Sequence, residues 1–207
     1  MSHSTHEGAG VPLQSDALLG DEERQLRAVV TAFANEVIAP QSYEADRTHT
    51  LSLPIVRQMG ELGLFGLPFP EEVGGQGGGY FSLCLAIEAI ARVDQSMAIT
   101  LEAGVGLGAM PLFRFGNQAQ QQRWLPDLIA GRALAGFGLT EAEAGSDAGA
   151  TRTRARLDGD DWVINGAKRW NTGVHRATHD LVFARTSGQD GSAVGITAFL
   201  VPTDTPG

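Results

Sequence analysis

Two segments of the sequence combine hydroxyl groups, turn-forming glycines and an aromatic ring, the groups that hold a phosphate and a flat heterocycle. The first is FGLTEAEAGSD over residues 137–147, in which Gly145, Ser146 and Asp147 follow a β-like run. At a turn, such residues expose backbone N–H groups and a hydroxyl that can donate to phosphate oxygens. Thr140 adds a second hydroxyl at the end of the β-like run, where it can point into a groove.

The second segment, NGAKRWNTG over residues 165–173, places an aromatic ring two residues before another hydroxyl. The indole of Trp170 could cover a flat ring, and the hydroxyl of Thr172 could hydrogen-bond the heteroatoms of that ring. A turn-rich β domain with a packed tryptophan and two capping hydroxyls accounts for the same residues equally well. The spacing alone therefore leaves a ring-binding site and a purely structural role both open.

Helical periodicity predicts the elements that precede these segments. Residues 1–20 are rich in small and polar residues, which is typical of a flexible leader, and residues 21–132 have the pattern of an α-helical domain. We expect its first helix to be capped by Asp21 and ended by Pro40. Further helices are predicted at 54–62, 80–93, 96–115 and 118–129, the last interrupted or kinked by Pro126.

Short β-like runs replace the helical pattern in the last third of the chain. Residues 133–207 are therefore predicted to form an antiparallel β domain after the helical one, which makes the fold class α+β. Alternation over residues 151–156 predicts that Arg152, Arg154 and Arg156 share the solvent face of one strand. Because the chain stops directly after a β-like run, we expect this β domain to be incomplete. The runs lie at residues 133–139, 151–157, 162–165, 180–185 and 195–201.

Three other patterns are weaker indications of a site. GVGLGA at 104–109 matches a relaxed dinucleotide fingerprint, but it lies within a helical pattern, where glycines let neighbouring elements approach closely. GGQGGG at 74–79 lacks the Lys-Ser or Lys-Thr of a phosphate loop and is interpreted as a connector. His175 and His179 are four residues apart but have no evident third ligand, so we predict no metal site.

The composition is that of a soluble globular protein. Hydrophobic residues make up 43% of the 207 residues, and the net charge of -9 argues against a nucleic-acid partner. The single cysteine, Cys84, cannot form an internal disulfide, so we expect it to be a buried apolar residue and the protein to be cytoplasmic. We see no signal peptide, and no run approaches the roughly 18 apolar residues of a membrane span.

Taken together, several motifs make the sequence similar to the acyl-CoA dehydrogenase family. The motifs that resemble its signature region are LTEAEAGSD at 139–147, DDWVINGAKRWNT at 160–172 and FART at 183–186. Those that resemble its helical domain are MGELGLFG at 59–66, PEEVGGQG at 70–77, FG at 115–116 and WLP at 124–126. The resemblance runs from about Asp21 to the end of the chain in the right order, and it shifts the interpretation strongly toward a flavin site.

The resemblance implies that the two segments bind FAD. Thr140 is then expected near the pyrimidine edge of the isoalloxazine ring, and Thr172 near N5, the ring atom that accepts hydride. Ser146 is expected beside the pyrophosphate, with the thioester arm of an acyl-CoA nearby, so it is also the expected substrate contact. The cofactor-binding residues that the resemblance implies are Phe137, Leu139, Thr140, Gly145, Ser146, Trp170, Asn171 and Thr172.

The resemblance also implies the reaction, which is α,β-dehydrogenation of an acyl-CoA thioester, as in fatty acid metabolism. An electron-transfer flavoprotein or a similar acceptor would then take the electrons. The family's catalytic base is a glutamate in a C-terminal helical bundle, which we expect to be absent from this chain. Glu141 and Glu143 lie in the flavin loop and do not match that base, so no catalytic residue is assigned here. We expect the isolated chain to be inactive and the complete protein to be a homo-oligomer.

Two departures from the family pattern leave other functions open. Ala142 stands where the family commonly has proline, and Asn171-Thr-Gly stands where it often has Ile-Thr-Asn. The second change makes the surroundings of Thr172 more polar. A flavin oxidase or monooxygenase on the same fold is one alternative, and a non-catalytic fragment or partner chain is another.

Overall fold

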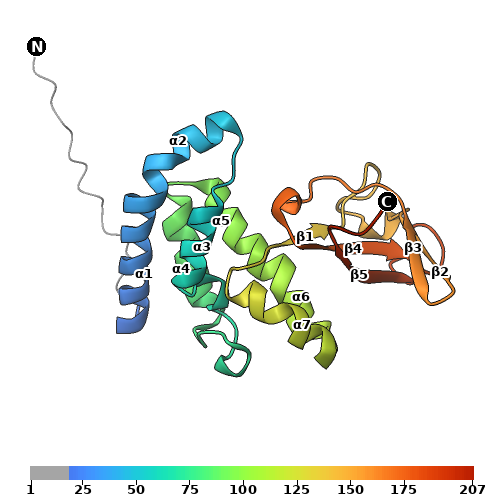
Figure 1. The fold of residues 1–207 in the computed structure, drawn as a ribbon, viewed down its shortest axis with the longest axis horizontal. Coiled ribbons are helices and arrows are strands. Elements are labelled where there is room, and N and C mark those ends of the chain that lie inside the picture. The colour runs from blue at the N-terminus through green and yellow to red at the C-terminus, as the bar shows by residue number, and fades with distance from the viewer. Residues whose placement is uncertain (1–18) are drawn as a thin grey trace, which may run out of the picture.

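A computed structural model describes residues 19–207, with the helices first and the strands after them (Figure 1). The leader expected over residues 1–20 lies outside the described residues, except for Leu19 and Gly20. The last helix ends at Ile129 and the first strand begins at Ala135. The predicted fold class is confirmed: a helical N-terminal part precedes a sheet.

The first helical segment is longer than the sequence pattern suggested. Helix α1 (Asp21–Phe33) continues through a π-helical segment (Ala34–Ile38) into α2 (Ala39–Thr48). The prediction that Pro40 ends the helix is wrong, because Pro40 lies in the first turn of α2, where a missing N–H is tolerated. The cap is Gly20 rather than Asp21, and the Glu23 side chain accepts from the Gly20 N–H.

The other predicted helices are confirmed within one or two residues. Helix α7 runs without interruption through Pro126, so the interruption expected there does not occur. Two short 3-10 turns, Leu64–Gly66 and Glu71–Val73, connect α3 to α4. The remaining helical elements are α3 (Leu53–Glu61), α4 (Gly79–Ala91), α5 (Gln95–Glu102), the π-helical segment Ala103–Ala109, α6 (Met110–Phe115) and α7 (Gln118–Ile129).

A continuous helix from Gln95 to Phe115 passes through the middle of the molecule and joins α5 to α6. Its 21 residues are long and apolar enough to cross a membrane, so the expectation that no such run exists is wrong. In the most apolar 18-residue stretch of this helix, 61% is buried inside the described structure, as in the core helix of a soluble protein. Cys84, expected to be buried, lies on the exposed side of α4.

The five strands form one mixed sheet, where the sequence had suggested an antiparallel one. Strand β1 (Ala135–Gly138) pairs parallel with β4 (His179–Arg185), and β2 (Arg154–Asp158) meets β4 in parallel at one residue pair. The pairs β2–β3 (Asp161–Asn165) and β4–β5 (Ile196–Pro202) are antiparallel. The parallel pair arises because the chain makes a long excursion between β1 and β4, through β2 and β3.

Strand β2 and the two residues before it separate exposed from buried side chains, as the alternating sequence predicts. Arg152, Arg154 and Arg156 are exposed, whereas Thr153 and Ala155 between them are buried. Asp190 accepts a hydrogen bond from Arg154 at 2.8 Å, across the surface of the sheet domain. These arginines therefore belong to a solvated, charge-paired face.

The helical part and the sheet meet through the glycine-rich π-helical segment. A Cβ at Gly108 would lie 2.8 Å from the Cβ of Ala135 in β1, and one at Gly104 would lie 2.8 Å from the ring of Phe65. Both distances are closer than real side chains approach. The GVGLGA pattern is helical, which excludes a dinucleotide fingerprint and confirms the interpretation that its glycines permit close packing.

Candidate functional site

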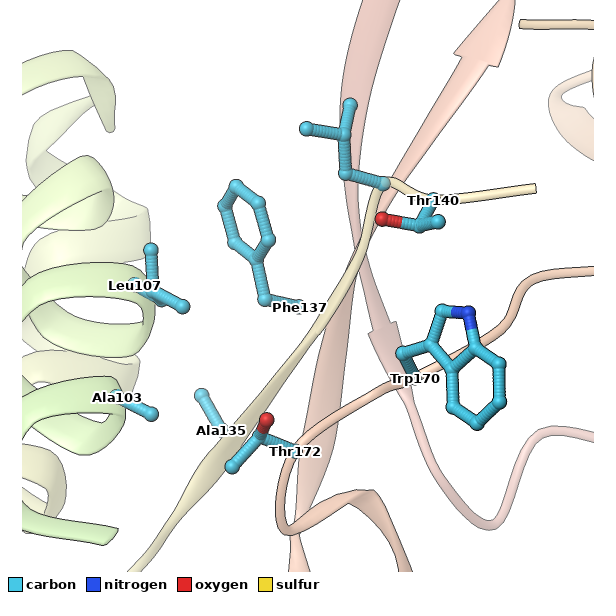
Figure 2. A pocket seen from close by; sticks show the side chains of 8 residues that line it. Ala103, Leu107, Ala135, Phe137, Thr140, Trp170 and Thr172 are labelled. Carbon is cyan, nitrogen blue, oxygen red and sulfur yellow. The ribbon is translucent and has the colours of Figure 1, made fainter. Parts of the chain in front are cut away.

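A cavity of about 170 Å³ lies where the π-helical segment faces strand β1 and the loop before β4 (Figure 2). Its walls come from three separate parts of the chain. The helix contributes small and aliphatic side chains, the strand an aromatic ring and a hydroxyl, and the loop an indole and a second hydroxyl. The lining residues are Ala103, Leu107, Ala135, Phe137, Leu139, Thr140, Trp170 and Thr172.

The strand and the loop place their side chains on the cavity for simple geometric reasons. Alternate residues of a strand share a face, so Ala135 and Phe137 of β1 both line the cavity, and Leu139 and Thr140 line it directly after the strand ends. In Figure 2 the ring of Phe137 extends toward Leu107. The ring of Phe137 also packs on that of Phe183 in β4, with their centroids 5.1 Å apart.

Trp170 has the most unusual conformation in the site. Its φ angle is +63°, in the left-handed region, and among the described residues only His49 is another non-glycine with a positive φ. Bulky residues adopt this conformation at a cost of about 1–3 kcal/mol, and such strained residues cluster at functional sites. Trp170 is nevertheless 83% exposed, so burial of its side chain cannot offset the cost of this backbone conformation. The surrounding contacts must hold it there.

A buried ion pair holds the Trp170 loop against the segment that follows β1 and carries Thr140. Lys168 donates from Nζ to Glu141 Oε1 at 2.7 Å and to the Leu139 carbonyl at 3.0 Å. The two charged side chains are only 8% and 7% exposed. The N–H of Arg169 donates to the Thr140 carbonyl at 2.8 Å, so backbone and side chain act together.

Glu141 is fully engaged in this arrangement. The backbone N–H groups of Arg152 and Thr153 donate to its two carboxylate oxygens at 2.7 and 2.9 Å. Burial would raise the pKa of Glu141, but the hydrogen bonds from Lys168 and from these two N–H groups outweigh it and lower that pKa to about 2. Glu141 is therefore a structural anion that joins three segments.

A second buried cation, Arg185 at the end of β4, fixes the segment that follows the Ser146 turn. Its guanidinium donates to the carbonyls of Gly149 (2.8 Å), Ser192 (3.0 Å), Val194 (3.2 Å) and Thr151 (3.3 Å). Four neutral acceptors and the Asp190 carboxylate, 3.6 Å from Nε, satisfy a side chain that is almost completely buried.

Five of the eight cofactor-binding residues predicted from the sequence line the cavity, namely Phe137, Leu139, Thr140, Trp170 and Thr172. Gly145 and Ser146 lie on the exposed turn beyond Glu141, outside the cavity. Asn171 donates to the carboxylate of Asp180 instead of lining the cavity. Their roles as ligands of a cofactor stay predictions.

Sequence reasoning missed the helical wall of the cavity and the charges that support it. Ala103 and Leu107 flank the glycines of the GVGLGA segment, whose spacing indicated close packing but did not name the partner strand. Lys168 and Glu141 are 27 positions apart, and only the fold brings them together. The two histidines weighed as ligands differ in environment, with His175 exposed and His179 buried beside Trp124. Among residues 19–207, no group of three His, Cys, Asp or Glu side chains could hold a metal ion.

The donor set of the cavity fits a flat, partly polar ring system. One side is apolar, two hydroxyls lie on its border, and an exposed indole stands at its edge in a strained conformation. The labelled hydroxyls of Thr140 and Thr172 can be followed in Figure 2. Apolar walls exclude water from a ring, while hydroxyls satisfy its heteroatoms in either donor or acceptor roles.

Comparison with known protein families covers both parts of the chain. Residues 20–132 match the family described as "Acyl-CoA dehydrogenase, N-terminal domain". Residues 136–207 match the one described as "Acyl-CoA dehydrogenase, middle domain".

Curated relatives are similar over nearly the whole chain. "Probable acyl-CoA dehydrogenase YngJ" of Bacillus subtilis is 45% identical over 190 residues, which cover 91% of this chain and 50% of that protein. The mitochondrial short-chain specific acyl-CoA dehydrogenase of Mus musculus is 38% identical over 189 residues, which cover 91% of this chain and 46% of that protein. The chain thus spans about half the length of the curated relatives it matches.

Solved structures share the same arrangement. Butyryl-CoA dehydrogenase from Megasphaera elsdenii superimposes with a TM-score of 0.84 at 35% identity, covering 91% of this chain and 50% of that one. Glutaryl-CoA dehydrogenase from Mycobacterium smegmatis, in complex with FADH2, gives 0.86 at 35% identity, with 94% and 48% covered. A chain in a structure of the electron transferring flavoprotein of Acidaminococcus fermentans gives 0.86 at 36% identity, with 91% and 50% covered.

Proposed function

Because this chain belongs to the acyl-CoA dehydrogenase family, we propose that it supplies the flavin-binding part of an enzyme that removes the α- and β-hydrogens of an acyl-CoA thioester. The observation that carries this proposal is the cavity itself. Two hydroxyls and an indole border an apolar wall at the junction of the helical part and the sheet.

FAD is the cofactor, and when bound it supplies the hydride acceptor that no side chain can provide. Phe137 and Leu139, which line the cavity, would keep water from the ring, and Thr140 and Thr172 would hydrogen-bond its polar atoms. Trp170 covers part of the ring with its exposed indole. Ser146, on its exposed turn, would hold the pyrophosphate and contact the thioester arm of the substrate.

Removal of the α-proton requires a base that Glu141 does not provide. Both of its carboxylate oxygens accept hydrogen bonds, and its lowered pKa makes it a weak proton acceptor. Glu143 is exposed and lies 3.9 Å from Arg152 in an ion pair. We therefore assign the catalytic base to neither Glu141 nor Glu143.

The substrate is an acyl-CoA, and a separate electron-transferring flavoprotein is the proposed acceptor of the electrons. The names of a butyryl-CoA dehydrogenase and a short-chain specific enzyme motivate the substrate, and the match to a chain in a structure of an electron transferring flavoprotein motivates the acceptor. An acceptor protein must approach the flavin edge, and the exposed indole of Trp170 marks the open side of the cavity.

The test is anaerobic titration of the full-length protein, purified with its flavin, with acyl-CoA thioesters of increasing chain length. The proposal predicts loss of the oxidised flavin absorbance with at least one thioester, and no such loss with the free acid.

Bleaching by NADH with no response to any thioester would replace this function with a reductase. Oxygen consumption without an acyl-CoA substrate would indicate an oxidase or monooxygenase, the alternative that the polar surroundings of Thr172 leave open. Full-length protein that binds no flavin would contradict the cofactor assignment itself.

A further inference from the structure

A carboxylate is buried directly behind the wall of the cavity. Asp180 of β4 lies opposite Gly136 of β1 in the parallel register and is 8% exposed. A Cβ at Gly136 would lie 2.6 Å from Asp180 Oδ1, and one at Gly138 would lie 2.9 Å from Oδ2. The two glycines of β1, on the face away from the cavity, therefore leave the space that this carboxylate occupies.

The partner of Asp180 is the residue between the two cavity-lining members of the loop. Asn171 donates from Nδ2 to Asp180 Oδ2 at 2.9 Å, while its neighbours Trp170 and Thr172 are among the residues that line the cavity. The resemblance to the acyl-CoA dehydrogenases puts isoleucine at position 171. In this chain, position 171 instead carries an amide that bonds to a buried carboxylate.

The pair has two oxygens that the described structure leaves without a donor. Asp180 Oδ1 and Asn171 Oδ1 are both buried and accept no hydrogen bond. A buried acceptor without a partner costs about 1–3 kcal/mol, so two in one pair call for a missing hydrogen. A proton on Asp180 turns its Oδ1 into a donor, and Asn171 Oδ1 belongs to the amide that already donates to Asp180 Oδ2, so an acid and an amide in this contact can form two hydrogen bonds.

Few charged groups lie near Asp180. The face of β1 packed on it carries only Gly136 and Gly138, and its partner in β5 is Val201. Lys168 is the nearby cation, and its ammonium is already bound to Glu141. His175 and Arg176, in the short turn before β4, are exposed. Burial raises the pKa of Asp180, against opposing hydrogen bonds from Asn171 and backbone N–H groups and the charge of Lys168.

We propose that Asp180 is a positioning residue: in its protonated form it pairs reciprocally with Asn171 and so fixes the loop that presents Trp170 and Thr172 to the flavin. The amide donates to one carboxyl oxygen, and the acid O–H donates back to the amide oxygen. The pairing stands on the contacts above, and its effect on the flavin rests on the proposed function.

Variants at the two positions separate a reciprocal acid–amide pair from an ionised carboxylate. Asp180→Asn supplies an N–H in place of the acid O–H and can still accept from Asn171, so it preserves the pairing. Asp180→Ala and Asn171→Ala each break it, and the double variant completes a cycle. Asp161→Asn, at an exposed position of β3, is the matched control for loss of a carboxylate.

The measurements on full-length protein are the urea unfolding midpoint, the dissociation constant and absorption spectrum of bound FAD, and the carboxyl ¹³C resonance of Asp180. Asp180→Asn and the control should bind FAD within about twofold of wild type. Asp180→Ala should bind it roughly tenfold more weakly, with a shifted spectrum, as expected for a lost hydrogen bond. The carboxyl resonance that is missing from the spectrum of Asp180→Asn belongs to Asp180. At pH about 5, where exposed aspartates are ionised, this resonance should have the chemical shift of a protonated carboxyl.

The same variants also give a pH readout. FAD binding by wild type should weaken, relative to Asp180→Asn, as the pH rises through the titration of the carboxyl. The reciprocal pair would be overturned if Asp180→Asn bound FAD as weakly as Asp180→Ala does. It would also be overturned if the Asp180 resonance titrated like that of an exposed aspartate. If Asp180→Ala lowers the unfolding midpoint but leaves flavin affinity and spectrum unchanged, the positioning role is wrong. Wild-type protein that binds no FAD refutes the proposed function instead, and the resonance and unfolding data still decide on the pair.

Discussion

At the scale of single residues, the feature that shapes the site most is a pair of opposite charges removed from water. Lys168 and Glu141 contribute no chemistry to the proposed reaction, yet they join the Thr140 end of β1 to the Trp170 loop. Their value is conformational, because each would be costly to bury alone. An exposed pair such as Arg132–Asp127 has no comparable effect.

Replacing Lys168 by methionine leaves Glu141 buried without its cation. We expect the free energy of unfolding to fall by about 3–5 kcal/mol, the cost of breaking a buried pair by removing one partner. Equilibrium urea denaturation measures this change. Arg132→Met, which removes the cation of an exposed pair, should cost less than about 1 kcal/mol. Equal effects of the two substitutions would contradict the structural role given to Lys168.

The pH dependence of stability follows from the lowered pKa of Glu141. The folded pKa, about 2, lies below the ordinary value of 4.5, so the stabilisation is fully present above pH 4.5. It is lost as the pH falls through the folded pKa, because the unfolded chain then binds the proton first. Glu141→Gln should flatten the stability profile between pH 4.5 and 2, whereas Glu143→Gln, at an exposed position, should leave it unchanged. Urea midpoints at several pH values would show whether the two profiles differ.

At the scale of secondary-structure elements, local patterns predicted the helices and strands well but not their partners. The period-two alternation of residues 151–156 predicted correctly which side of β2 is exposed. The parallel pairing of β1 with β4 could not be predicted, since it depends on residues more than 40 positions apart. Pro40 was misjudged because a π-helical segment before it, Ala34–Ile38, carries no local signal in the sequence.

For the site, the resemblance to a family supplied what spacing could not. Their spacing in the sequence did not decide whether Trp170 and Thr172 bind a ring or have a purely structural role. The fold places both on one cavity with Phe137, which neither composition nor periodicity indicated. The buried polar contacts, Glu141 with Lys168 and Asp180 with Asn171, were unpredictable because each joins segments that meet only in three dimensions.

Arg185 controls the long loop between β4 and β5. It donates to the carbonyls of Ser192 and Val194 on that loop, and to those of Gly149 and Thr151 in the segment before β2. In Arg185→Met these carbonyls lose their donor, so residues 187–194 should be released. Limited proteolysis should then cut within 187–194 roughly tenfold faster, in line with an opening equilibrium shifted by about 1.4 kcal/mol. Arg156→Met changes an exposed arginine of β2 and should be cut at the wild-type rate. Equal cleavage rates for the two variants would contradict the role of Arg185 in holding the loop.

At the scale of the whole molecule, the close approach of a helix to a strand determines whether the cavity exists. Gly108 is the contact point, since a methyl group there would come within 2.8 Å of the Cβ of Ala135. Gly106, on the same helical segment, faces only the flexible end of Glu102. The two positions are therefore a matched pair for testing the junction.

We expect Gly108→Ala to force the helix away from β1, to destabilise the protein by about 1–3 kcal/mol and to weaken FAD binding. Gly106→Ala should be neutral or stabilise by up to about 1 kcal/mol, because alanine is the better helix former. Urea denaturation and flavin titration of both variants give the comparison. A Gly108→Ala protein with wild-type flavin affinity would show that the junction does not shape the cavity.

The cavity has walls from residues 103–107, 135–140 and 170–172, and this has a consequence for how the protein survives in a cell. A ligand that binds only when all three walls are assembled stabilises the assembled state by mass action, by about 2.7 kcal/mol at a hundredfold excess over its dissociation constant. Flavin supply then becomes a determinant of abundance. A destabilised variant such as Gly108→Ala would accumulate when riboflavin is plentiful and be degraded when it is scarce, so a vitamin would act as a folding aid for this protein.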